Sequence, residues 1–144
     1  MGFVIASVGH AAAVAFEEAL TPHGLHPRHF AVLKGLRGGE AQSQQQLAAA
    51  LGIPASRLVG LLDLLVERGL VERQDSPTDR RVKLVRLVEA GRTALDELIA
   101  VAGQSERRVT AGLTAEDKAE LRRLLGVVHA NVAAEAGGTR TRVW

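Results

Sequence analysis

The fold is decided between Ser43 and Gly91, where the chain reads SQQQLAAALGIPASRLVGLLDLLVERGLVERQDSPTDRRVKLVRLVEAG. Ser43 and Gln46 have the spacing of a capping box, in which two side chains satisfy free backbone N–H groups at the start of a helix. Gly52 stands where that helix needs a left-handed C-terminal residue, and Pro54 suits the first turn of a following helix. The sequence therefore predicts two helices joined by a turn of three or four residues.

The two helices are predicted to pack through one apolar side of each. In the first helix the inward residues would be Leu47, Ala50 and Leu51. In the second helix apolar residues recur at positions 58, 61, 62 and 65, which share one side at 3.6 residues per turn. The other side of the second helix is left free, and its early positions are Ala55, Ser56, Arg57, Val59 and Gly60.

A β-hairpin is predicted after the second helix. Residues 70–74 can be extended, residues 75–79 (DSPTD) have turn chemistry, and residues 82–87 are rich in β-branched and aliphatic side chains. Three cations lie near the tip of this hairpin: Arg80, Arg81 and Lys83. Asp79 stands beside them and is predicted to brace one of the arginines.

This order of elements is one in which small proteins read duplex DNA. One helix enters the major groove, which is about 12 Å wide, and a charged hairpin beside it reaches the backbone or the minor groove. Arg57 could pair with guanine, and Ser56 could contact a base edge or a phosphate. Ala55 or Val59 could touch a thymine methyl. Two alternatives stay open: a merely solvated Arg57, and a hairpin with ordinary surface charges.

Taken together, these pieces resemble the multiple antibiotic resistance regulator (MarR) family. The resemblance rests on residues 51–53 (LGI) in the turn, residues 67–71 (ERGLV) before the hairpin, and a hairpin motif in which Asp-x-Arg is followed after five residues by Leu-Thr. The motif falls on Asp79, Arg81, Leu87 and Val88, so only the final Thr differs. The resemblance covers essentially the whole chain. It implies a mainly α fold with a small β-hairpin wing, in a dimeric repressor or activator that often responds to small phenolic or lipophilic ligands.

On this basis the DNA contacts are expected from the helix starts, the free side of the second helix and the wing. The expected residues are Ser43, Gln44, Pro54, Ala55, Ser56, Arg57, Gly60, Arg73, Asp79, Arg80, Arg81 and Lys83. The chain departs from the family pattern at Gly60, where an arginine is frequent, at Pro54, where a polar residue is frequent, and at Val88, which lacks the capping hydroxyl. Fewer polar anchors would leave more of the reading to Arg57 and the wing.

Length and charge agree with one DNA-binding domain. The chain has 144 residues, of which 47% are hydrophobic, and this excludes a disordered protein and a second catalytic domain. The formal net charge is only +2, yet residues 28–92 hold 11 cations against 7 acidic residues, whereas residues 1–27 hold two glutamates and no Lys or Arg. This local excess predicts modest nonspecific affinity for DNA and a strong dependence on salt.

The sequence contains no cysteine, so disulfides, thiolate metal sites and a cysteine redox switch are excluded. No signal peptide is expected, because the apolar residues 2–15 have no basic region before them. Glu17 and Glu18 are expected to keep this stretch short of a membrane span. We therefore expect a cytoplasmic protein with no membrane association.

Both chain ends are predicted to form dimerisation helices. Apolar residues cover nearly every side of residues 1–21, and a partner chain is the simplest cover for such a helix. Residues 89–112 also read as helix, and a second capping box, Thr114 with Asp117, begins a last helix with apolar residues at 121, 124, 125, 128 and 132.

The domain prediction follows from these patterns. A single domain, residues 1–144, would comprise dimerisation helices (1–21 and 89–136), a winged helix-turn-helix region (27–88) and a flexible tail (137–144). A twofold dimer would hold two recognition helices about 34 Å apart and would require a pseudo-palindromic operator. The alternative is that the terminal helices pack only within the monomer.

Histidines gather near the first predicted helix, at His10, His23, His26 and His29. They could bind a transition metal or titrate near neutral pH, although Pro22 and Pro27 argue against one regular helix presenting them together. No metal or cofactor is predicted, and whether the cluster senses metal or pH stays open. By resemblance, the junction of the first two helices lies near the ligand pocket of the family, so a small aromatic or lipophilic effector would contact His10, Phe16, His26 and His29.

An enzyme is not expected, because the sequence offers no phosphate loop, no zinc-binding helix motif, no tyrosine and no nucleophile elbow. The prediction is a homodimeric, sequence-specific DNA-binding transcription regulator, with a ligand-responsive repressor as the leading form. The alternative is a helical dimerisation adaptor that does not bind specific DNA. Gly60 and Ala55 favour that alternative, since neither offers a polar group to a base.

Overall fold

The computed structural model describes residues 1–135, and the tail predicted at residues 137–144 lies outside the described residues. The elements follow in the order α1 (Gly2–Leu20), η1 (Thr21–His23), α2 (Pro27–Gly35), β1 (Gln42–Ser43), α3 (Gln44–Leu51), α4 (Ala55–Glu67), β2 (Val71–Asp75), β3 (Lys83–Leu87), α5 (Glu89–Val109) and α6 (Ala115–Glu135). A mainly helical chain with one small antiparallel sheet confirms the predicted fold class.

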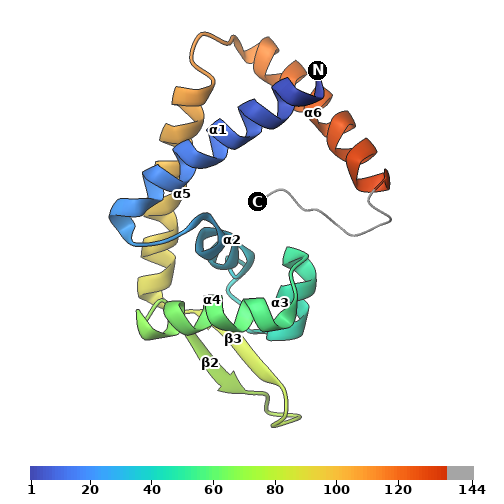
Figure 1. Ribbon diagram of the computed structural model, residues 1–144. Coiled ribbons are helices and arrows are strands. Elements are labelled where there is room, and N and C mark those ends of the chain that lie inside the picture. Colours follow the sequence, from blue (N-terminus) through green and yellow to red (C-terminus); the bar gives the residue numbers. More distant parts are fainter. Residues whose placement is uncertain (136–144) are drawn as a thin grey trace.

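The elements are arranged along the long helix α5 (Figure 1). The wing, formed by β2, β3 and the loop between them, lies with α3 and α4 at one end of the molecule, and α2 lies next to α3, α4 and α5. α1 crosses α5, and α6 lies at the end farthest from the wing. The domain boundaries given above stay a prediction.

Helices α3 and α4 form the predicted helix-turn-helix, with an angle of 109° between them. Ser43 Oγ accepts a hydrogen bond from the Gln46 N–H (3.1 Å), and Gln46 Oε1 accepts one from the Ser43 N–H (3.0 Å), so the capping box is confirmed. Gly52 ends α3 with φ of 67°, as expected of a left-handed cap. Pro54 lies one residue earlier than predicted, as the N-cap of α4.

A core of leucine and valine side chains joins α2, α3, α4 and the wing to α5. In α4 the buried residues are Leu58, Leu62 and Leu65, all with no exposed surface. Each such leucine contributes about 1.5 to 3 kcal/mol of burial. In α3 the buried pair is Leu47 and Ala48, so the prediction that Ala50 faces inward is wrong. The buried side of α3 is rotated because α3 contacts α2 and β3 as well as α4.

The predicted hairpin is confirmed, and a third strand extends it. The strand order is β1-β3-β2 and both pairs are antiparallel, with Arg73 opposite Val85 and Glu72 opposite Arg86. Because side chains alternate along a strand, Arg73 shares its face of the sheet with the buried Val71 and Val85. Glu72 and Arg86 point from the opposite face.

The junctions at the two ends of α5 follow the sequence expectation. Val88 is the N-cap of α5 and makes no side-chain cap hydrogen bond, as expected from the missing hydroxyl. Before α6, Thr114 Oγ1 accepts a hydrogen bond from the Asp117 N–H (3.1 Å), and Asp117 Oδ2 accepts one from the Thr114 N–H (2.9 Å). The hydrogen bonds that the Thr114 N–H and the Thr114 hydroxyl donate to Asp117 Oδ2 lower the pKa of Asp117. The second predicted capping box is therefore confirmed.

Helices α1 and α6 leave much apolar surface uncovered. Leu20 is the one buried residue of α1, and none of the described side chains of α6 is buried. The exposed large apolar residues of these helices are Phe3 (86%), Val4 (56%), Val8 (60%), Val14 (40%), Leu121 (41%), Leu124 (47%), Leu125 (46%), Val127 (51%) and Val132 (55%). An isolated monomer would hold this surface in water.

By length and composition alone, residues Gly2–His23 could cross a membrane. Contrary to the sequence expectation, Glu17 and Glu18 do not make this helix too short or too polar to span a membrane. The bent pair α3 and α4 is long and apolar enough to span a membrane only if the two helices are taken as one broken span. That pair carries leucines of the buried core, which accounts for its hydropathy.

Candidate nucleic-acid interface

The buried leucines of α4 fix which of its residues face outward. At about 100° per residue, the side opposite Leu58, Leu62 and Leu65 is centred on Ser56, Gly60 and Asp63, which we call the outer face of α4. All three are exposed. A Cβ built on Gly60 would meet no atom within 4 Å. The backbone of the helix is therefore accessible at the middle of this face.

Arg57 and Val59 flank the outer face of α4 on its two sides. Both are exposed, and 43% of the Val59 surface is accessible. Ala55 and Ser56 lie in the first turn, where no side chain caps the helix. Free N–H groups at such a helix start suit a phosphate oxygen. The sequence-predicted residues of α4 are thus all accessible, with Arg57 at the edge of the outer face and not at its centre.

The start of α3 lies beside the wing. Ser43, Gln44 and Gln45 line a cavity of about 220 Å³ together with Arg81, Val82 and Lys83. Strand pairing between β1 and β3 produces this proximity, because Ser43 lies opposite Leu84. The structure therefore brings together predicted contact residues that are almost 40 positions apart in the chain.

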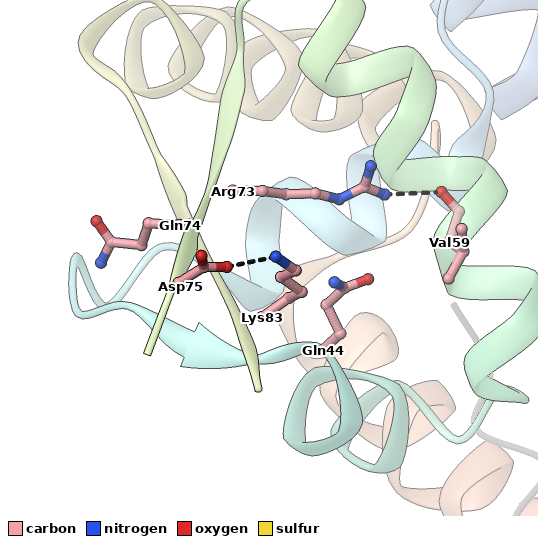
Figure 2. A pocket seen from close by; sticks show the side chains of 6 residues that line it. All are labelled: Gln44, Val59, Arg73, Gln74, Asp75 and Lys83. Carbon is pink, nitrogen blue, oxygen red and sulfur yellow. Dashed lines mark hydrogen bonds and ion pairs between the residues drawn. The ribbon is translucent and has the colours of Figure 1, made fainter. Parts of the chain in front are cut away.

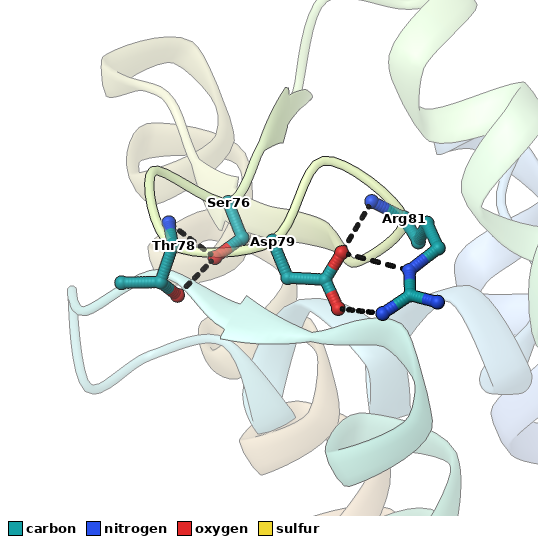
Figure 3. Close-up of polar contacts among 4 residues, drawn as sticks. All are labelled: Ser76, Thr78, Asp79 and Arg81. Carbon is teal, nitrogen blue, oxygen red and sulfur yellow. Dashed lines mark hydrogen bonds and ion pairs between the residues drawn. The ribbon is translucent and has the colours of Figure 1, made fainter.

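The tip of the wing is organised by Asp79 (Figure 3). Asp79 Oδ1 accepts hydrogen bonds from the Arg81 backbone N–H (3.0 Å) and from Arg81 Nε (3.1 Å), and Oδ2 accepts one from Arg81 Nη2 (3.2 Å). These bonds lower the pKa of the Asp79 carboxyl. The Arg81 side chain is 91% exposed. Asp79 thus holds an accessible guanidinium in one orientation, as predicted, while Ser76 and Thr78 bond to each other within the turn.

Two other predicted contact residues are paired within the chain (Figure 2). Lys83 Nζ forms an ion pair with Asp75 across the two wing strands. Arg73 bonds to α4, through Nη1 to Asp63 Oδ1 (2.6 Å) and through Nη2 to the Val59 carbonyl oxygen (3.2 Å). A cavity of about 460 Å³ between the wing and the helices is lined by Gln44, Val59, Arg73, Gln74, Asp75 and Lys83. Sequence reasoning did not single out Asp63.

The predicted effector residues are only partly assembled. Phe16 packs edge-on against Phe30, with ring centroids 5.6 Å apart, and His10 is exposed on α1. A cavity of about 260 Å³ in the same region is lined instead by His23, Leu25, Arg68, Leu70, Ala94, Glu97 and Leu98. Within residues 1–135, no group of three or more His, Asp and Glu side chains is placed to hold a metal ion.

His26 and His29 form a capping box at the start of α2. His26 Nδ1 accepts a hydrogen bond from the Arg28 N–H (3.2 Å), and His29 Nδ1 accepts one from the His26 N–H (3.0 Å). His26 Nε2 lies 3.4 Å from Glu17 Oε1 on α1. Partial burial, followed by the charges of His26 and Arg68, lowers the pKa of His29. The Nδ1 atom of each imidazole thus accepts a hydrogen bond where α1 meets α2.

We expect acid to destabilise the fold through this capping box. Because the pKa of His29 is lower in the folded chain than its ordinary 6.5, the unfolded chain binds the proton more tightly. Its contribution to stability is therefore complete above pH 6.5 and is lost as the pH falls below that value. His29→Gln keeps an acceptor at this position without a titrating group. Denaturant unfolding from pH 7.5 to 5 should give a shallower pH dependence for this variant, and equal slopes would contradict the assignment.

A helix-turn-helix followed by a wing with an accessible arginine at its tip defines a winged-helix DNA-binding protein. Residues 23–82 match the model of the MarR family. The apo form of wild-type MarR from E. coli is 30% identical, with 89% of this chain and 95% of that chain covered and a TM-score of 0.76. A mutant of the E. coli protein complexed with operator DNA is also 30% identical, with 88% and 91% covered and a TM-score of 0.77.

CouR from Rhodococcus jostii RHA1, bound to p-coumaroyl-CoA, is 35% identical, with 88% of this chain and 90% of that chain covered and a TM-score of 0.74. The chain belongs to the MarR family of winged-helix transcription regulators. The resemblance stated from the sequence is therefore confirmed.

Proposed function

We propose that this protein is a homodimeric transcription regulator that binds a pseudo-palindromic operator and is released from it by a small molecule. The observation that carries the proposal is the proximity of the start of α3 to the wing. Ser43, Gln44 and Arg81 line one cavity there. The outer face of α4 would enter the major groove, and Arg81 would reach the adjacent minor groove. A cytoplasmic location without membrane attachment and without catalysis follows from this role.

A second copy of the chain is the proposed cover for α1 and α6. The exposed apolar side chains of α1, and those of α6 at positions 121, 124, 125 and 132, favour an apolar partner surface, which a second copy of the chain would supply. A twofold dimer would hold two α4 helices about 34 Å apart. We infer that a small aromatic or lipophilic effector acts by favouring dimers in which this spacing is wrong. An effector can do so only through different affinities for the two states. His10, Phe16, His26 and His29 remain the proposed contacts.

Arg57→Ala should relax sequence preference. We expect a loss of about 1 to 3 kcal/mol of discrimination at one base-pair position, because a bidentate pair with guanine would be removed. Arg80→Ala is the comparison, since loss of a phosphate contact should weaken all duplexes alike and reduce the salt slope by about one. Binding isotherms on operator variants at several salt concentrations measure both quantities. Unchanged preference in Arg57→Ala would remove the base contact from the proposal.

The proposed function itself is tested by selecting duplexes from a random pool at fixed ionic strength. A regulator should enrich one motif with two half-sites related by a twofold axis. A dimerisation adaptor, the alternative, should enrich none. Failure to retain any duplex at low salt would reject DNA binding altogether.

A further inference from the structure

The inner face of the wing, defined as the side chains of Val71, Arg73, Asp75, Lys83, Val85 and Leu87, changes character along its length. Near the core it carries Val71, Val85 and Leu87, all buried. Toward the tip it carries the ion pair of Asp75 with Lys83. Arg73 lies between the two, at the level where the apolar core ends. Toward the tip the inner face is charged, and Arg73 makes polar contacts with α4.

Arg73 supplies this contact through two hydrogen bonds to one helix. Its acceptors are Asp63 Oδ1 at 2.6 Å and the Val59 carbonyl oxygen at 3.2 Å, and they lie about one turn apart on α4. The Arg73 side chain is 26% exposed, and its Nε is buried without a hydrogen-bond partner. Its guanidinium is therefore directed at α4 and is largely withdrawn from the surface on which Arg81 stands. A planar fork suits two such acceptors, which a lysine could not engage in the same way.

The other wing ion pairs do not reach the helix. Arg86 pairs with Glu72 on the opposite face of the same two strands, and Lys83 pairs with Asp75 within the hairpin. Within residues 1–135, the side-chain hydrogen bonds found between the wing strands and α4 are those of Arg73. The outer face of α4 also includes Asp63, so the same bond neutralises a carboxylate that would face the phosphates of DNA.

We propose that Arg73 is a positioning residue that fixes the wing against α4, so that Arg81 and the outer face of α4 meet double-stranded DNA as one unit. This inference rests on the proposed function, and it replaces the expectation that Arg73 itself contacts DNA. In the absence of the Arg73 bonds the wing strands stay paired, but the tip can swing relative to the helix. DNA binding must then order the tip, which lowers affinity.

Coupling between Arg73 and Arg81 tests the proposal. On the operator selected by the wild-type protein, Arg73→Gln should lower affinity about tenfold, within the range for residues of one network. The slope of log K against log salt should stay unchanged, whereas a lost phosphate contact would reduce it by about 0.9. Arg81→Ala should weaken the wild type clearly and the Arg73→Gln protein little, because an unanchored wing no longer delivers Arg81. Additive effects, or a reduced slope in Arg73→Gln, would overturn the proposal.

Asp63→Ala gives a second test, because the direction of the change in DNA affinity distinguishes a positioning role of Arg73 from a direct contact of Arg73 with DNA. Removing a carboxylate near DNA should by itself strengthen binding, and so should the release of Arg73 toward a phosphate. The positioning role instead requires Asp63→Ala to weaken binding, because one of the two bonds to α4 is lost. Stronger binding would overturn the proposal. This variant also keeps the test available if Arg73→Gln does not fold.

Arg86→Gln is the matched control, because it removes an arginine from the same strands and leaves α4 untouched. In the Arg86→Gln protein, Arg81→Ala should lower operator affinity as much as it does in the wild type. If it did not, the positioning role could not be assigned to Arg73. Failure of the proposed function looks different, since the wild-type protein would then select no operator at all.

Discussion

Replacing Leu124 and Leu125 of α6 with glutamate should convert the protein to a monomer and lower its affinity for the operator by about a thousandfold. Both side chains are nearly half exposed in the single chain, at 47% and 46%. In a dimer they would be buried, and a charge placed there without a partner is strongly unfavourable. A monomer engages one half-site, so its binding should fall to the nonspecific level, which is typically at least about a thousandfold weaker.

Val127→Glu is the matched control for this prediction. Val127 is 51% exposed on the same helix, but it lies on a different side from the stripe at positions 121, 124, 125, 128 and 132. Sedimentation equilibrium should give a dimer for the wild type and for Val127→Glu, and a monomer for the double variant. If the double variant stayed dimeric and bound the operator normally, the α6 stripe could not be the dimer contact.

The elements that the sequence predicted correctly are those coded by neighbours in the chain. Ser43 with Gln46, Gly52, and Thr114 with Asp117 act within one helix turn or its cap, so their spacing alone is sufficient. The inward side of α4 follows from periodicity for the same reason. The pairing of Asp79 with Arg81 joins residues two positions apart. Each of these signals is local, and the structure bears out each one.

The features that the sequence did not predict depend on partners far along the chain or on unusual residue types. β1 is two residues long, too short to show alternation, and it exists because β3 pairs with it. The buried side of α3 depends on where α2 and β3 lie. The His26 and His29 capping box has the same spacing as Ser43 and Gln46, with Pro27 at the first helical position, so the pattern was visible but its residue types were not recognised.

The role of Arg73 could have been narrowed from strand alternation. Arg73 is two residues after Val71, so it shares the core-facing side of β2 and cannot point outward as a solvent-facing cation would. Its acceptor on α4 could not be found that way, because Asp63 is ten residues earlier and nothing local links the two. Thus the sequence predicted the helix-turn-helix and the wing correctly, whereas the tertiary structure was needed to see that Arg73 bonds to α4 and that Arg81 stays exposed.

Gly91→Ala should destabilise the fold by about 3 kcal/mol or more, at the upper end of the range for added bulk in a packed site. Gly91 is buried in the first turn of α5, and a Cβ built there would lie 1.9 Å from the Leu70 carbonyl oxygen and 3.2 Å from a methyl group of Leu87. The near atom is backbone, and it also accepts a hydrogen bond from the Val88 N–H. Relief therefore requires α5 to move away from the base of the wing.

Gly103→Ala is the same substitution in the same helix, but its expected effect on the stability of the fold is opposite. The nearest atom to a Cβ at Gly103 is the end of the flexible Arg107 side chain, at 3.7 Å. Alanine in a helix interior should stabilise by up to about 1 kcal/mol relative to glycine. Thermal unfolding should show Gly91→Ala melting roughly 10 °C below the wild type and Gly103→Ala melting at or above it.

Because the displaced contact joins α5 to the base of the wing, Gly91→Ala should also weaken operator binding at temperatures where the chain is still folded. A variant that lost stability but kept full affinity would show that the wing and α5 are not coupled at Leu70.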